Sequence, residues 1–199
     1  MKAVMLEVDP ALLEQRRRLG LDRWDEMWEG VLHMAPAPAD EHQRMVGELL
    51  AFLLPLFRAT GRGMIRMGIN VFDESSPSEN YRIPDLTFVA AGHERLLAAD
   101  GIRGGAPDAV IEVRSPGDES YDKLPFFARL VVPEVVILDR DTKRAEVFRL
   151  QGADYTRREP DAAGEIVCET MGVRLRTLPS SPPRLQVRDT ADASRFVEI

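Results

Sequence analysis

The sequence predicts an α/β or α+β fold, in which a mixed and mostly meandering β-sheet packs against one long helix. Two observations support this prediction. Apolar residues recur at helical spacing over residues 40–59, and from residue 64 onward most apolar runs are short and separated by turn signals. The 199 residues suit one domain over residues 1–178, followed by a polar, proline-rich tail over residues 179–199 that we expect to be extended or partly disordered.

Two short elements precede the long helix. Asp9 followed by Pro10 is typical of an N-cap and a first helical position, so the sequence predicts a helix that runs to Arg18. Residues 23–34 mix aromatic and β-favouring side chains around Glu29-Gly30, which predicts a β-hairpin.

The long helix has the clearest pattern in the chain. Pro55 should kink it or end its first segment, and Gly61 marks its end. Its apolar stripe comprises Met45, Val46, Leu49, Leu50, Phe52, Leu53, Leu56 and Phe57.

Short strands account for most of the remainder. A further helix is expected over Tyr121–Leu130, although Pro125 is unfavourable within it. The expected strands cover residues 64–72, 82–90, 109–114, 134–138 and 145–150, with two weaker ones over 165–168 and 173–175.

Composition narrows the class of function. A formal net charge of −7 argues against a general nucleic-acid coat protein but leaves room for a nuclease, because metal ions can supply local positive charge. One cysteine, Cys168, excludes an intrachain disulfide, and three histidines argue against a structural zinc site. The chain starts without a secretion signal and its longest apolar run, residues 49–57, is too short for a membrane span, which predicts a cytoplasmic protein with no membrane partner.

The expected central strand carries two charges of opposite sign. In the segment PDAVIEVRSP, Glu112 and Arg114 interrupt the apolar residues 109–113. Residues two apart in a strand face the same side, so an acid and a base emerge next to each other. Either they form a buried ion pair, or Glu112 belongs to an active site.

A second acid precedes another expected core strand. Asp85 follows Pro84 and comes just before the apolar run 86–89. It could be an ordinary turn or cap aspartate. If the two strands are neighbours, however, Asp85 and Glu112 can share one hard cation. A salt bridge from Arg114 to either acid is the alternative.

Phosphodiester chemistry would also need a cationic group. Lys123, in the expected helix after the central strand, could reach the two acids, or it could be an ordinary solvated lysine. Arg114 could clamp a phosphate but stays protonated, so it cannot act as a general base.

The order of these motifs resembles the Uma-type restriction endonuclease family, which belongs to the PD-(D/E)XK nuclease superfamily. The resemblance covers roughly residues 24–150. It rests on Pro84-Asp85, Glu112-Val113-Arg114-Ser115-Pro116, Asp122-Lys123-Leu124 and the segment Val132–Asp139, with Glu26–Gly30 similar to the family's hairpin and His42-Gln43 similar to the start of its long helix.

The resemblance implies a restriction-endonuclease-like core, with a mixed central sheet flanked by helices and an N-terminal hairpin. It implies that Asp85 and Glu112 bind Mg²⁺, with Mn²⁺ as a substitute, and that Lys123 replaces the usual superfamily lysine. Glu26 would be a supplementary acid or else a surface hairpin residue. His42 would lie in the cleft, or serve as a cap or packing residue.

The chain also departs from the family pattern. Phe127 stands where the family usually has tyrosine, Val131 where it has glycine, and Val135-Val136 where it often has a tyrosine-tryptophan pair. These changes leave the expected metal ligands intact, whereas Pro125 bears on how far Lys123 can reach.

The sequence therefore predicts a Mg²⁺-dependent DNA endonuclease that hydrolyses phosphodiester bonds, with Asp85 and Glu112 on the metal and Lys123 or Arg114 assisting. A homodimer is expected, since cutting a duplex requires attack on two strands. The alternative is a non-catalytic regulatory module that binds nucleic acid or protein on a nuclease-like fold.

Overall fold

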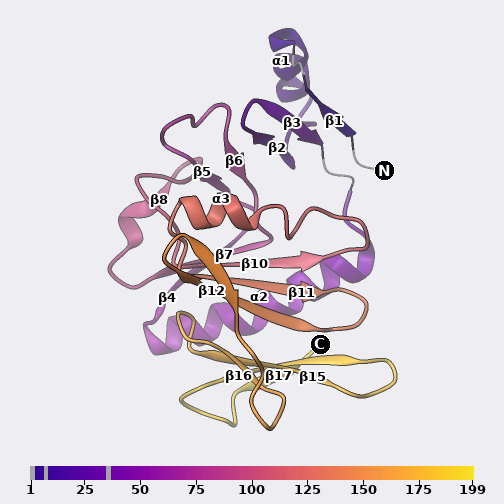
Figure 1. Ribbon diagram of the computed structural model, residues 1–199, viewed down its shortest axis with the longest axis vertical. Coiled ribbons are helices and arrows are strands. Elements are labelled where there is room, and N and C mark those ends of the chain that lie inside the picture. The colour runs from indigo at the N-terminus through magenta and orange to yellow at the C-terminus, as the bar shows by residue number, and fades with distance from the viewer. Residues whose placement is uncertain (1–2, 7–8, 35–36) are drawn as a thin grey trace.

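The computed structural model describes residues 3–6, 9–34 and 37–199, and within them it shows a mixed α+β fold built around a six-stranded sheet (Figure 1). The middle strands β10 and β11 are parallel, and every other pair in this sheet is antiparallel. The spatial order is β13 (Asp154–Arg157), β12 (Ala145–Gln151), β11 (Glu134–Asp139), β10 (Ala109–Arg114), β7 (Leu86–Ala90) and β4 (Gly63–Met67).

One face of this central sheet is covered by the long helix α2 (Asp40–Thr60) and by a four-stranded C-terminal sheet. Leu49, Leu53 and Phe57 of α2 are buried against Ile111 and Val113 of β10 in one continuous apolar core. The C-terminal sheet comprises β14 (Ile166–Cys168), β15 (Val173–Leu178), β16 (Arg184–Asp189) and β17 (Phe196–Glu198).

The opposite face of the central sheet packs against the short helix α3 (Leu124–Arg129). Phe126 and Phe127 of α3 are buried with Val110, Val135 and Ile137. A third sheet, of seven strands, lies beyond α3 in Figure 1. Its strands are β1 (Ala3–Met5), β2 (Asp25–Trp28), β3 (Val31–Met34), β5 (Asn70–Phe72), β6 (Tyr81–Arg82), β8 (Leu97–Ala98) and β9 (Gly101–Ile102), with α1 (Pro10–Arg18) before β2 and the short 3-10 helix η1 (Glu94–Leu96) before β8.

Several elements lie where the sequence predicts them. The side chain of Asp9 caps α1, and β2 and β3 form the hairpin around Glu29-Gly30. Helix α2 runs through Pro55 as one element, so Pro55 does not end a first segment, and the helix ends at Gly61, which adopts the left-handed conformation (φ 66°) that glycine tolerates best.

Two expected strands are each divided between sheets. The segment 64–72 splits into β4 and β5 because Gly68, at φ 57°, turns the chain between them. The segment 82–90 splits into β6 and β7, separated by Ile83-Pro84-Asp85. Proline lacks the amide proton that a strand ladder needs, so the break at Pro84 has a local cause.

The prediction of an extended or partly disordered tail over residues 179–199 is wrong. Residues 179–199 do not trail from the domain, because β16 pairs with β15 and β17 pairs with β16, which completes the C-terminal sheet. Leu185, Val187 and Ile199 are buried in the core beneath α2. Alternating apolar residues in this segment were the available signal, but the surrounding prolines and polar residues obscured them.

Helix α3 is shorter than expected at its N-terminal end. It begins at Leu124, with Pro125 in its first turn and Lys123 at the N-cap position. Proline is tolerated in the first turn of a helix, so Pro125 starts this helix where the sequence alone made it look like a disruption.

None of the helices in the described part of the chain combines the length and the apolar composition that a bilayer crossing requires.

We expect Leu185→Ala to lower the free energy of unfolding by about 2–5 kcal/mol, because Leu185 is fully buried between the C-terminal sheet and the core. Phe196→Ala is the control in the same sheet, since Phe196 is 51% exposed, and we expect it to change stability far less. Urea unfolding of both variants measures the difference. Equal stability of the Leu185 variant and the parent chain would contradict the packing of β16.

Candidate active site

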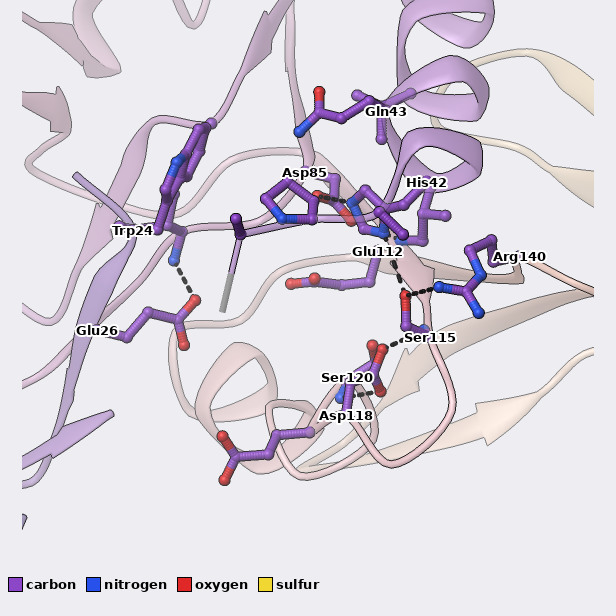
Figure 2. A pocket seen from close by; sticks show the side chains of 18 of the residues that line it. Trp24, Glu26, His42, Gln43, Asp85, Glu112, Ser115, Asp118, Ser120 and Arg140 are labelled. Carbon is purple, nitrogen blue, oxygen red and sulfur yellow. Dashed lines mark hydrogen bonds and ion pairs between the residues drawn. The ribbon is translucent and has the colours of Figure 1, made fainter. Parts of the chain in front are cut away.

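A cavity of about 760 Å³ opens where four parts of the fold meet (Figure 2). These are the β2–β3 hairpin, the start of α2, the segment just before β7, and the loop that follows β10. The acids and the lysine singled out in the sequence, Asp85, Glu112, Lys123 and Glu26, all line this cavity.

Glu112 enters the cavity because of strand alternation. Ala109, Ile111 and Val113 of β10 face α2, whereas Val110 faces α3, so Glu112 also points to the α3 side. Its side chain is only 5% exposed, and both carboxylate oxygens accept hydrogen bonds from the Lys123 ammonium, at 3.1 and 3.2 Å.

Asp85 lies beside Glu112 because of strand register. Leu86, the first residue of β7, pairs with Ile111 of β10 in an antiparallel ladder, so this register brings Asp85, just before β7, next to Glu112, just after Ile111. The Oδ2 atom of Asp85 accepts a hydrogen bond from the Val113 amide at 2.7 Å, and its Oδ1 lies 2.9 Å from Nε2 of His42.

Lys123 connects the strand acid to the hairpin. Its Nζ lies 2.8 Å from Oε1 of Glu26 as well as within hydrogen-bond distance of Glu112, and its side chain is 12% exposed. Both carboxylates hold the lysine in place, so the N-cap position of α3 brings its ammonium into the cavity.

Glu26 is held firmly on β2. Its Oε1 accepts a hydrogen bond from the Ile83 amide at 2.8 Å, and its Oε2 accepts one from the Trp28 indole at 2.8 Å. The side chain is 9% exposed. Glu26 therefore lies inside the cavity wall, not on the outer surface of the hairpin.

The site contains more acid than base. Burial raises the pKa of Glu112 to about 8, and Asp85 and Glu26 add to this rise, while Lys123 opposes it. Burial alone would lower the pKa of Lys123, but the charges of Glu112 and Glu26 outweigh it and raise that pKa. Burial and the neighbouring acids therefore oppose the ionisation of Glu112, while the ammonium of Lys123 favours it.

This imbalance and the donor chemistry fit a divalent cation. Asp85 and Glu112 supply two carboxylates to one cavity, and Mg²⁺ usually binds through one or two carboxylates while keeping several waters. Within the described residues, no cluster of three or more His, Cys, Asp or Glu side chains is arranged around a common point. The residues thus suit a hydrated ion and not a cage made wholly of protein ligands.

Arg114 lies outside the cavity. Its guanidinium pairs with Asp139 on the neighbouring strand at 2.8 Å and lies 5.4 Å from the centre of the Tyr121 ring. The ion pair between Glu112 and Arg114, one alternative from the sequence, is not the arrangement in the structure, because Asp139 takes the arginine and Lys123 takes the glutamate.

Three further polar residues meet beside the acids, and Arg140 is the one that no sequence motif included. His42 contacts Asp85 through Nε2, and its Nδ1 is 3.5 Å from Oγ of Ser115. Arg140 donates a hydrogen bond to the same hydroxyl at 3.4 Å. Ser115 follows directly after β10, which was a usable signal, whereas Arg140 comes from the β11–β12 turn and has no local signature.

Comparison with known proteins identifies a family and a similar fold. A family model described as "Putative restriction endonuclease", Uma2, matches residues 17–179. No curated protein sequence matches the chain. Among solved structures, the chain is similar to "a putative nuclease belonging to DUF820" from Anabaena variabilis ATCC 29413, with a TM-score of 0.58 and 17% sequence identity over 74% of this chain and 82% of that one.

At this identity the structural likeness shows a shared fold. The family model reaches further, since it spans the hairpin, both helices that border the cavity, and every strand of the central sheet. The chain therefore belongs to the Uma2 family, whose description is "Putative restriction endonuclease".

Proposed function

We propose that this chain is a Mg²⁺-dependent endonuclease that hydrolyses phosphodiester bonds in DNA. The observation that carries the proposal is the buried Glu112, which lies opposite Asp85 across two paired strands and contacts a buried lysine. Several carboxylates close together in a protein interior are unfavourable unless enough positive charge balances them. Lys123 supplies one positive charge, and a bound metal ion would supply the rest. Membership of the Uma2 family supports the choice of nuclease.

Asp85 and Glu112 are the residues that would hold the ion. Bound there, Mg²⁺, or Mn²⁺ in its place, would supply charge neutralisation at the phosphate and a lowered pKa for water. His42 and the Val113 amide hold the two oxygens of Asp85, which keeps that carboxylate in one orientation. Glu112 must give up its proton for the ion to bind.

Lys123 has the cationic role in this proposal. Glu26 and Glu112 keep its ammonium charged and immobile, so it can donate hydrogen bonds to a phosphate oxygen without reorganising when negative charge develops. Arg114 is committed to Asp139 and does not line the cavity.

The substrate and the assembly belong to the same proposal. DNA is chosen because restriction endonucleases act on DNA, and the family carries that description. A twofold dimer would provide two sites for the two strands of a duplex. Light scattering on the purified chain tests the dimer independently of activity.

Substitution of either acid should strongly reduce cleavage. We expect Asp85→Asn and Glu112→Gln to lower the rate of plasmid cleavage in Mg²⁺ by at least about 100-fold, because each removes one carboxylate ligand. Calorimetry should show that Mn²⁺ binding weakens in parallel.

Glu146→Gln is the matched control for these variants. Glu146 is also a buried strand glutamate of the central sheet, with side-chain exposure of 9%, but it pairs with Arg144 and Arg157 away from the cavity. We expect its activity to match that of the parent chain. The proposal fails if the parent chain cuts no DNA of any form with Mg²⁺ or Mn²⁺ and binds neither ion.

The two cationic residues can be separated by mutation. We expect Lys123→Met to reduce the cleavage rate about 100- to 1000-fold, because it removes a preorganised donor at the phosphate. Arg114→Gln should reduce the rate by no more than a few fold. Single-turnover kinetics at saturating Mg²⁺ measure both, and the reverse ranking would move the cationic role to Arg114.

The metal-free chain should become less stable as pH rises from about 5 to about 8. Burial raises the pKa of Glu112 from 4.5 to about 8, so across this window the folded chain keeps a proton that the unfolded chain has lost. The unfolded state then binds fewer protons than the native state, and the free energy of unfolding falls as pH increases.

Urea unfolding in EDTA at several pH values measures this dependence. Glu112→Gln should flatten it, because Glu112 is the group whose shifted pKa lies inside the window among the described residues with resolved shifts. A parent chain whose stability stays constant or rises between pH 5 and pH 8 would contradict the buried, protonated state of Glu112.

A further inference from the structure

The cavity has the size of a nucleotide site. Its volume of about 760 Å³ lies in the range of about 300–1,000 Å³ that is typical of pockets enclosing small molecules. Glu112 and Lys123 are 5% and 12% exposed, so a phosphate must enter the cavity to reach them. A stacked and paired nucleotide is held within its duplex, whereas an unpaired one can enter such a space.

One wall of the cavity is aromatic and apolar. Figure 2 shows Trp24 across the cavity from His42 and Arg140, with Glu112 between them in the view. The glycine at position 68 lets the indole pack closely, because a Cβ there would lie 2.7 Å from the ring. Apolar side chains that also line the cavity are those of Met34, Val46, Met67 and Ile83.

The second tryptophan provides a contrast. Trp28 stacks on His33 with ring centres 4.2 Å apart, and the Arg82 guanidinium lies 4.1 Å from its ring centre. Trp28 is not among the residues that line the cavity. The Arg23 guanidinium lies farther from the centre of the Trp24 ring, at 5.0 Å. Arg23 also lines the cavity.

Charge alone gives this chain weak attraction for DNA. The net charge is −7, and binding through phosphates depends on the number of Lys and Arg contacts. The Lys and Arg side chains that line the cavity are Arg23, Lys123 and Arg140, and Lys123 is already held by two carboxylates. Stacking of a base on an aromatic ring would supply the missing affinity without requiring a particular sequence.

We infer that the cavity takes an unpaired nucleotide of single-stranded DNA, with its base stacked on Trp24 and its phosphate beside Glu112 and Lys123. Arg140 lies across the cavity from Trp24 and donates a hydrogen bond to Ser115, so it is placed to contact the phosphate of the next nucleotide along the strand. The inference rests on the proposed nuclease function and adds a substrate class, namely single strands, flaps or unpaired junctions in preference to fully paired duplex.

Binding can be tested apart from cleavage. Titration of the metal-free chain with a 12-nucleotide oligothymidine should quench tryptophan fluorescence, whereas the same oligonucleotide annealed to its complement should quench it much less. In Trp24→Phe the remaining tryptophan, Trp28, should give no quenching, although binding persists through the phenyl ring. Trp24→Ala should weaken binding by about 5- to 150-fold, the range for loss of one stacked base.

Cleavage gives the second readout. In Mg²⁺ we expect the single strand, or a flap of the same sequence, to be cut at least about 10-fold faster than the paired duplex. Equal or faster cutting of the duplex, without quenching by the single strand, would overturn this inference and leave the nuclease function intact. No cutting of any DNA would instead overturn the proposed function. Faster cutting of the matching RNA strand would overturn the choice of DNA.

Discussion

The geometry of the site depends on the ion pairs that the buried ammonium of Lys123 makes with two glutamates. The ammonium bonds to Glu26 on the N-terminal hairpin and to Glu112 on the central sheet, while the backbone of Lys123 starts α3. The ammonium group thereby connects the hairpin, the central sheet and α3. Removing one partner from a buried ionic group is costly, since the remaining charge has neither water nor a counter-ion. The lysine thus serves both to assemble the cavity and to place a positive charge at its floor.

The same group explains why the site is suited to a cation. Burial raises the pKa of Glu112 to about 8, and Asp85 and Glu26 add to this rise because one ammonium cannot balance all three acids. The acid excess lies in a cavity whose opposite wall holds Trp24, and whose rim holds Arg140 and Ser115. A hydrated metal ion would balance the excess negative charge of the acids, and the phosphate of a bound nucleotide would then lie beside positive charge. The metal, nuclease and single-strand proposals all depend on this charge balance.

Local patterns were sufficient for much of the fold. The capped helix after Asp9, the hairpin around Glu29-Gly30, the apolar stripe of α2 and the strand β10 lie where the sequence predicts them, since each depends on neighbours in the chain. The error over residues 179–199 has a non-local cause. Whether residues 184–189 form a strand depends on pairing with β15 and on burial beneath α2, and neither is visible in a polar, proline-rich segment.

For the site, the order of residues was enough to reveal three unusual positions: an acid inside an apolar strand, a second acid before another strand, and a lysine one element later. The partners of these residues follow from the folded arrangement. The register of β7 against β10 placed Asp85 beside Glu112, and the parallel pairing of β10 with β11 gave Arg114 to Asp139. The start of α3 then left Lys123 to reach both Glu112 and Glu26. Charged side chains pair with the nearest opposite charge in space, and that distance is set by register and packing, which no local stretch of sequence encodes.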